Sequence, residues 1–209
     1  MKRSSVRFLI TSFFISNLFH FIKMSFTAQS LIVKEGVITE LENNVAEILF
    51  ELKESSDFAD ITKIRICAAE RHETEAGTAV VITVPYICHT FLRVFQVDLT
   101  DVLSKKLNET VFFVVKRSIL APESKTTKKA SQKRPRSRTL TAVHTAILED
   151  LIFPEEVTAR RVRYSMTKGA ERVEKIAISC NRLTHDYYPV LSRVYENITG
   201  RKTVFSNKL

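Results

Sequence analysis

The chain has 209 residues, 44% of them hydrophobic, and carries 32 Lys and Arg against 23 Asp and Glu, a formal net charge of +9. This length and apolar content suffice for one sizeable core, which excludes a chain that is disordered throughout. The cysteines Cys67, Cys88 and Cys180 are odd in number and lack metal-ligand spacing. They therefore predict buried thiols in a reducing compartment rather than a disulfide frame or a zinc site.

The first 23 residues differ in composition from the rest of the chain. Three basic residues precede an apolar run over residues 8–22, which is interrupted by polar residues, and a second methionine follows at Met24. The run is too short for a membrane-spanning helix, which needs about 20 residues. A signal peptide would suit the basic-then-apolar order, but no clean small-residue cleavage site stands near residue 23. We expect residues 1–23 to be an extension and Met24 to be the functional start.

The next patterns predict a helix and a β-hairpin. Apolar residues recur at helical spacing over residues 41–52, with glutamates, including Glu42, on the opposite side, which is typical of an amphipathic helix. Alternating β-branched residues over 61–68 and again over 78–84 predict two strands. The polar stretch between them contains Gly77, so we expect a hairpin.

A long helix and a buried strand follow. Apolar spacing predicts a helix over residues 91–107 that closes at Lys105 and Lys106, where positive charges complement the helix dipole. The continuous apolar run at residues 111–115, VFFVV, predicts a strand buried on both faces.

The second part of the chain begins with another helix, over residues 140–151. Ser137 or Thr139 can cap it, and Pro154 ends it after Phe153. The apolar residues expected to face the core are Leu140, Val143, Ile147 and Leu151.

A second hairpin and a last helix complete the pattern. Alternation predicts strands over residues 160–167 and 172–179, a helix over 187–199 ended by Gly200, and a final strand around Val204. No sequence repeat is visible. The order of elements predicts an α+β fold in which a mixed or antiparallel sheet packs with helices, plus an exposed basic arm.

Residues 124–138, SKTTKKASQKRPRSR, form that arm. They hold seven of the 32 basic residues and no acidic one, whereas the other 194 residues carry 25 Lys and Arg against 23 Asp and Glu, a net charge of +2. This density is typical of polyphosphate binding, because each cation that neutralises a phosphate releases a counterion. A solvated loop is the alternative.

The arm has no aromatic residue, so contacts to phosphate and ribose are expected rather than base stacking. Pro135 favours an extended segment along which Arg134, Arg136 and Arg138 could follow a phosphate backbone. The predicted RNA-binding residues are Lys116 and Arg117 before the arm; Lys125, Lys128, Lys129, Lys133, Arg134, Arg136 and Arg138 within it; and Arg160, Arg161 and Arg163 after it.

Features of an enzyme are missing from the sequence. The four glycines stand far apart, so they cannot build a phosphate-cradling loop. The acidic pairs lie beside basic stretches and the histidines are scattered, so no acid/base pair or nucleophile is indicated. We expect no catalytic residue, no cofactor and no metal.

The stretch QKRPRSRTLTAVHTAILEDLIFPEEV, residues 132–157, closely resembles the signature of the eukaryotic small-subunit ribosomal protein seven family, the eukaryote-specific protein rather than the bacterial-type one. Similarity continues in ITVP (82–85), VFFVVKRSIL (111–120) and VYENITGRKTVF (194–205), and covers about residues 27–206 in all.

The resemblance implies a structural constituent of the small (40S) ribosomal subunit, with one ribosomal-protein domain over residues 24–209 that carries the arm. It implies binding to small-subunit rRNA and support of pre-rRNA processing and subunit assembly. The implied partners are neighbouring small-subunit proteins and pre-ribosomal assembly factors, with no membrane and no small-molecule substrate. The implied location is the cytoplasm, after a nucleolar assembly stage.

Two other interpretations stay open. In the first, residues 133–138, KRPRSR, are the localisation signal of a nuclear nucleic-acid-associated adaptor, which would sediment with chromatin rather than with small subunits. In the second, residues 1–23 are the signal peptide of a secreted heparin-type binder. That protein would need glycan at Asn108 or Asn197 and would leave three cysteines unpaired.

Overall fold

The computed structural model describes residues 28–34, 36–53, 63–74, 77–121, 134–165, 171–179 and 187–207. The expected extension over residues 1–23, arm residues 124–133, Gly169 and Cys180 lie outside these ranges. In chain order the elements are η1 (Ala28–Leu31), α2 (Glu40–Lys53), β1 (Ala68–Thr74), β2 (Gly77–Val84), η3 (Tyr86–Cys88), α3 (His89–Leu107), β3 (Thr110–Val115), η4 (Arg136–Arg138), α4 (Leu140–Ile152), β4 (Glu156–Ser165), β5 (Glu171–Ser179), α5 (Tyr187–Thr199) and β6 (Thr203–Ser206).

The strands form two mixed sheets, which confirms the α+β class. Sheet one has the order β1-β2-β3 and sheet two the order β4-β5-β6. In each, the first two strands pair antiparallel and the last two pair parallel. Parallel neighbours need a crossover connection, which α3 supplies in sheet one and α5 in sheet two. The order helix, hairpin, helix, strand thus occurs twice, in a first half from α2 to β3 and a second half from α4 to β6.

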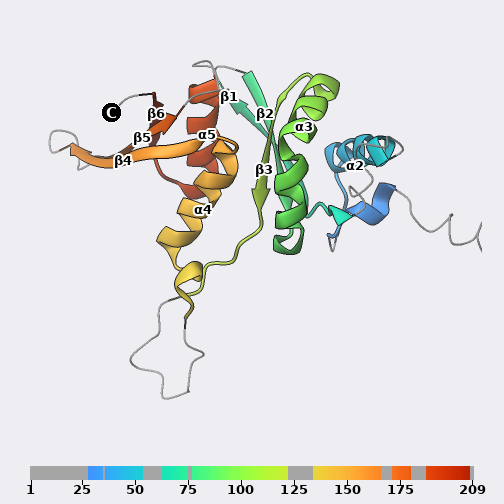
Figure 1. Ribbon diagram of the computed structural model, residues 1–209, viewed down its shortest axis with the longest axis horizontal. Helices are drawn as coiled ribbons and strands as arrows, with labels where there is room; N and C mark the ends of the chain where they lie inside the picture. The colour runs from blue at the N-terminus through green and yellow to red at the C-terminus, as the bar shows by residue number, and fades with distance from the viewer. Residues whose placement is uncertain are drawn as a thin grey trace, which may run out of the picture.

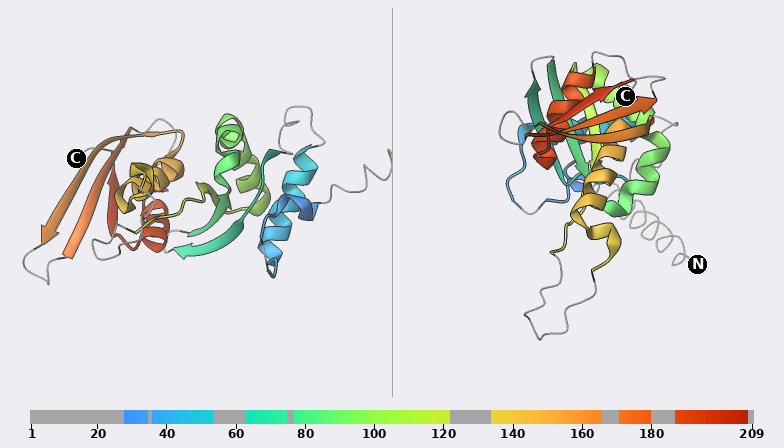
Figure 2. Two further views of the ribbon diagram at one scale, coloured as in Figure 1. Left: turned by 90° about the horizontal axis from the view of Figure 1, so that it is seen from below. Right: turned by 90° about the vertical axis from the view of Figure 1, so that its left-hand side faces the viewer.

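The two halves stack into layers along the long axis of the molecule. Figures 1 and 2 show sheet two at one end, then α4 and α5, then sheet one, and finally α3 and α2 at the other end. Val80, Ile82 and Phe113 face the core built with α2 and α3. Val81 and Phe112, the alternate residues of the same strands, face the core built with α4, α5 and sheet two. Sheet one is therefore covered on both faces, as expected of its VFFVV strand.

Among the residues that the structure describes, sheet two is covered on one face only. Ile176, Ile178 and Phe205 lie in the core shared with α4 and α5. Val204, the neighbour of Phe205 in β6, points the other way and is 49% exposed. Sheet two consequently ends the stack and presents its second face to solvent.

The predicted strand over residues 61–68 is wrong, although the predicted hairpin exists. Ile64 and Ile66 are buried in the core, but among the described residues 63–68 only Ala68 belongs to a strand, as the first residue of β1, and Ile66 forms an isolated β-bridge to Ile32. The strand that pairs with β2 is β1, AAERHET. Its alternation is charged rather than apolar because it is the edge strand of sheet one, where exposed charged side chains are common.

Glu42 does not lie on a solvated side of the first helix, as the sequence suggested, because its side chain is only 1% exposed. Its carboxylate accepts hydrogen bonds from the Thr39 N–H (2.9 Å) and the Lys34 ammonium (2.8 Å), and a longer one from the Ala69 N–H (3.4 Å). The Glu42 N–H donates in return to the Thr39 hydroxyl, at 3.4 Å. This capping box starts α2 and ties it to β1.

The helix predicted over residues 140–151 is confirmed as α4, with one error in its core face. Val143 and Leu151 are buried and Ile147 is partly buried, but Leu140, in the first turn, is 46% exposed. Thr139 stands at the N-cap, yet its hydroxyl donates to the Arg136 carbonyl instead of capping the helix. The last helix, its left-handed end at Gly200 (φ 68°) and the final strand are all confirmed.

Candidate nucleic-acid interface

The arm joins the body through two segments, 116–120 and 134–139, which we call the arm root. The Leu120 N–H donates to the Arg138 carbonyl at 3.1 Å, so the two segments touch. Pro135 is extended as expected, but the residues after it turn into η4, closed by a bond from the Arg138 N–H to the Pro135 carbonyl (3.1 Å). Arg134 also folds back, donating to the Arg138 carbonyl at 3.4 Å. The expectation of an extended arginine segment is therefore wrong beyond Pro135.

A groove of about 560 Å³ opens beside the arm root, between η3, the end of β3 and α4. The small side chains Ala142 and Ala146, one helical turn apart, leave room for it together with Ser118 and Ser137. We call this hollow the root groove. Its other lining residues are Tyr86, His89, Lys116, Arg117 and Arg138.

Two of the cations in the root groove are unneutralised. Lys116 and Arg138 are exposed, and neither side chain makes a hydrogen bond or ion pair with any residue in the described parts of the chain. Both were predicted as RNA-binding residues, and the fold brings them together although they are 22 positions apart.

Arg117 lies in the same groove but is held by Asp150, at the end of α4. The two terminal guanidinium nitrogens of Arg117 donate to the Asp150 carboxylate, Nη1 to Oδ2 and Nη2 to Oδ1 at 3.1 Å. The Val115 N–H also donates to Oδ2, at 3.1 Å. The Asp150 side chain is 4% exposed and that of Arg117 is 14% exposed. Such a two-point pair is among the strongest charged contacts. The geometry gives Arg117 a structural role, and its contact with RNA stays a prediction.

One wall of the root groove is aromatic. The Tyr86 side chain is 67% exposed, and its ring lies parallel to the His89 imidazole, with an interplanar angle of 3° and ring centroids 6.0 Å apart. Burial lowers the pKa of His89; Arg93 and Arg117 lower it further, while Asp150 opposes them. The imidazole is therefore mainly neutral at pH 7. Sequence reasoning missed this platform, since a lone tyrosine after Pro85 carries no motif.

Sheet two holds a second buried carboxylate. Glu174, 1% exposed, pairs with Arg160 (2.7 Å), Arg172 (2.7 Å) and Arg201 (3.3 Å). Burial alone would raise the pKa of Glu174, but these three arginines outweigh it and lower the pKa below its ordinary value. Arg160 is thus tied to the body, and its predicted RNA contact stays untested.

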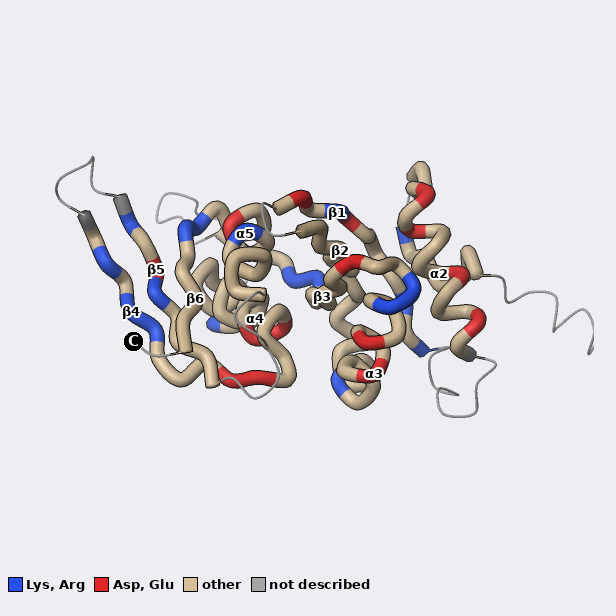
Figure 3. The backbone as a smooth tube through the Cα atoms, turned by 90° about the horizontal axis from the view of Figure 1, so that it is seen from above, with Lys and Arg blue, Asp and Glu red and all other residues tan. Residues whose placement is uncertain are grey.

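The solvent face of sheet two carries the remaining predicted cations. Alternation along β4 places Arg161 and Arg163 on the face opposite to Arg160, and Lys175 is the direct partner of Arg161 in β5. We call Arg161, Arg163 and Lys175 the open face. None of them forms an ion pair within the described ranges. Figure 3 shows Lys and Arg along β4 and β5 at the end of the molecule away from α2.

The predicted site residues thus divide into groups. Lys125, Lys128, Lys129 and Lys133 lie outside the described residues. Arg117 and Arg160 are neutralised by buried carboxylates, and Arg134 turns back on the arm root. Lys116, Arg136, Arg138, Arg161 and Arg163 are exposed. Asp150 and Glu174, which decide this division, carry no sequence signal other than their charge.

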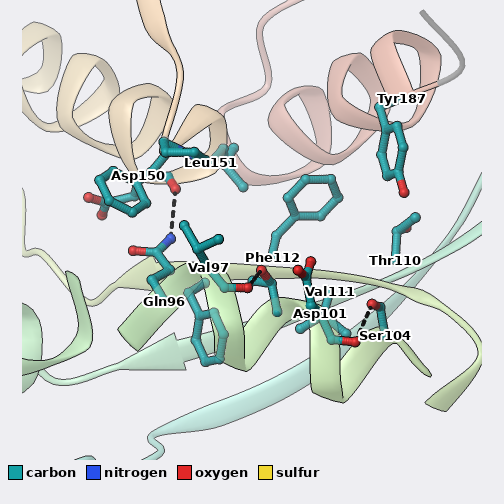
Figure 4. A pocket seen from close by; sticks show the side chains of 14 residues that line it. Gln96, Val97, Asp101, Ser104, Thr110, Val111, Phe112, Asp150, Leu151 and Tyr187 are labelled. Carbon is teal, nitrogen blue, oxygen red and sulfur yellow. Dashed lines mark hydrogen bonds between the residues drawn. The ribbon is translucent and has the colours of Figure 1, made fainter. Parts of the chain in front are cut away.

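A second pocket, between α3, β3 and the ends of α4 and α5, has no cation in its lining. It measures about 140 Å³, and Asp101, Asp150, Thr110 and Tyr187 are among its lining residues. Figure 4 shows Gln96 of α3 donating to the Asp150 carbonyl of α4 (3.4 Å), and Ser104 donating to the Asp101 carbonyl within α3 (3.1 Å). Because acidic side chains line it, this pocket does not suit a phosphate.

Within the described ranges, no three His, Cys, Asp or Glu side chains gather closely enough to hold a metal ion. None of the helices in those ranges has the length and apolar character needed to cross a bilayer.

Comparison with known proteins gives consistent matches over most of the chain. The family model described as ribosomal protein S7e matches residues 30–207. The chain is 34% identical to small ribosomal subunit protein eS7 of Dictyostelium discoideum, covering 81% of this chain and 89% of that protein. It is 37% identical to eS7A of Saccharomyces cerevisiae (80% and 90% covered) and 36% identical to eS7 of Drosophila melanogaster (79% and 87% covered).

Proposed function

This chain belongs to the ribosomal protein S7e family, and from that premise we propose that it is a structural constituent of the small ribosomal subunit that binds small-subunit rRNA. The relatives are named as small ribosomal subunit proteins. Their similarity covers most of their own length, so the proposal concerns the whole folded body and not one motif.

The observation that carries RNA binding is the set of cations that the fold leaves without a carboxylate. Arg161 stands directly opposite Lys175 in sheet two, an arrangement that destabilises a sheet through like-charge repulsion. The fold neutralises Arg117 and Arg160 inside the body, yet Lys116, Arg138 and the open face have no acidic partner among the described residues. A polyanion removes this repulsion and gains the entropy of released counterions.

We further propose that the protein supports subunit assembly and pre-rRNA processing, and that it passes through a nucleolar stage before residing on cytoplasmic ribosomes. Neighbouring subunit proteins and assembly factors are its expected partners. Support for this comes from the family and from the basic arm, whose lysines can engage precursor RNA before the final contacts form. A nuclear adaptor remains the alternative, with a different distribution in the cell.

Sedimentation of the tagged full chain from eukaryotic cells tests the proposal. We expect it to comigrate with small subunits through a high-salt wash. A variant in which Lys125, Lys128, Lys129 and Lys133 are replaced by Gln should fold but incorporate poorly. Lys105→Gln with Lys106→Gln, in the last turn of α3, is the control for loss of positive charge outside the arm. Recovery of the native chain with chromatin, or only at the top of the gradient, would overturn the proposal.

A further inference from the structure

We propose that the root groove binds one unpaired nucleotide of RNA, with the base stacked on Tyr86 and its phosphate held by Lys116 and Arg138. The inference rests on the proposed RNA-binding function and adds to it a site with a defined ligand. It also adds base stacking at the arm root to the contacts with phosphate and ribose that the sequence predicted for the arm.

The aromatic wall supplies the first step. The Tyr86 side chain is two-thirds exposed, so its ring is accessible to a ligand in the groove. Its ring lies parallel to the His89 imidazole, with 6.0 Å between the ring centroids. His89 begins α3 and is partly buried, so the platform stands on a regular element. A base has a flat face that stacks on such a ring whatever its identity.

The charges supply the second step. Lys116 ends the β3 side of the groove and Arg138 ends the η4 side, and both cations lack a described counter-charge. Arg117, which also lines the groove, is already neutralised by Asp150. The groove therefore offers one phosphate group two cations that have no described counter-charge, while Ala142 and Ala146 in its lining are small and uncharged. This lining suits a base beside small apolar residues and a phosphate beside the two cations.

Size and position supply the third step. A volume of about 560 Å³ lies within the range of roughly 300–1,000 Å³ typical of small-ligand sites. The groove lies at the arm root, so a strand held by the arm lysines could place one base in it. Bases of an intact A-form duplex are stacked and cannot reach such a wall, whereas bases in loops and bulges can. The site should prefer single-stranded RNA.

The test measures binding of the full chain to an octamer of adenylate and to a duplex RNA, at one salt concentration. Tyr86→Ala should weaken octamer binding by about 5- to 150-fold, the loss expected for one stacked base, and change duplex binding by less than about twofold. Tyr86→Phe keeps the ring and should bind as the native chain does. Tyr164→Ala is the matched control, because Tyr164 is a similarly exposed tyrosine (62%) outside the groove.

A photocrosslink gives a second readout that does not depend on affinity. An octamer carrying 5-bromouridine should crosslink the peptide that contains Tyr86. If Tyr86→Ala leaves octamer binding unchanged, or crosslinks fall only on other peptides, the groove proposal is overturned while RNA binding through free cations stands. If the native chain binds neither RNA, the proposed function fails as well. Stronger binding of a polyglutamate peptide than of the octamer, abolished by Tyr86→Ala, would instead identify a protein ligand.

Discussion

The two halves of this molecule have the same order of elements but different surroundings. Sheet one is covered by helices on both faces, and its strand β3 reads TVFFVV, with five buried residues in succession. Sheet two is covered on one face, and its strand β4 reads EVTARRVRYS. The inward side of sheet two packs Ile176 and Phe205, whereas the outward side presents Arg161 and Arg163. One topology thus yields a structural layer in the first half and a charged surface in the second.

The two halves also differ in how their buried carboxylates are used. Both halves contain buried carboxylates, Glu42 in the first and Asp150 and Glu174 in the second. In the first half Glu42 caps a helix, while in the second the carboxylates hold arginines in place. The arginines without a carboxylate partner among the described residues are the ones that we propose to contact RNA. Topology alone would not distinguish the halves.

The largest expected effect on the free energy of unfolding concerns the buried core of sheet one. Phe113→Ala in sheet one should lower the free energy of unfolding by about 3–5 kcal/mol, because the ring is fully enclosed and its removal leaves a cavity. Val204→Ala on the open side of sheet two should change it by no more than about 0.5 kcal/mol. Urea unfolding followed by circular dichroism gives both values. Similar losses for the two variants would mean that sheet two is covered as fully as sheet one.

The next effect concerns the buried carboxylates. Glu174→Gln should cost about 3 kcal/mol at neutral pH, the low end for removing one partner of a buried ion pair, since its arginine partners can turn to solvent. The pKa of Glu174 is lowered on folding. The stability that the ionised Glu174 carboxylate contributes is therefore fully present above pH 4.5, the ordinary pKa, and is lost as the pH falls through the lower pKa of the folded state.

Glu42 in the first half should depend on pH in the same direction. Burial would raise its pKa, but hydrogen bonds from Lys34 and two backbone N–H groups outweigh burial and lower it. Stability measured from pH 7 down to pH 3 should fall less steeply in Glu174→Gln and in Glu42→Gln than in the native chain. Glu149→Gln, an exposed neighbour of Asp150, serves as the control. If stability falls with pH in Glu174→Gln as it does in the native chain, the ion pairs of Glu174 with its three arginines do not stabilise sheet two.

The smallest effect on stability is expected on the open face. Arg161→Gln with Arg163→Gln should leave the free energy of unfolding within about 0.5 kcal/mol of the native value, because neither side chain has a described partner. The variant should, however, reduce the slope of log K against log salt for RNA by about 1.4–1.8, the value for two lost phosphate contacts. The Lys105 and Lys106 double variant should keep the native slope. Equal slopes in both variants would remove the open face from the RNA surface.

Much of this architecture could be predicted from the sequence, since apolar and alternating patterns located α2, α3, α4, α5, β2, β3, β4, β5 and β6. The edge strand β1 could not, because its residues are mostly charged and its pairing depends on β2. The site was predicted as a set of basic residues, but periodicity cannot tell Arg160 from Arg161. That distinction comes from Glu174, 14 positions away on the neighbouring strand. The root groove likewise joins residues from three separate segments.

The central claim is that this chain binds RNA through cations that the fold and the arm leave unneutralised. The most direct measurement is the affinity of the full chain for small-subunit rRNA as a function of salt concentration. If six or seven cations each contact a phosphate, log K against log salt should have a slope of roughly −4 to −6, at about 0.7–0.9 per contact. A slope shallower than about −2 would contradict the account, because it would mean that the basic residues are mostly solvated and that RNA is held by other contacts.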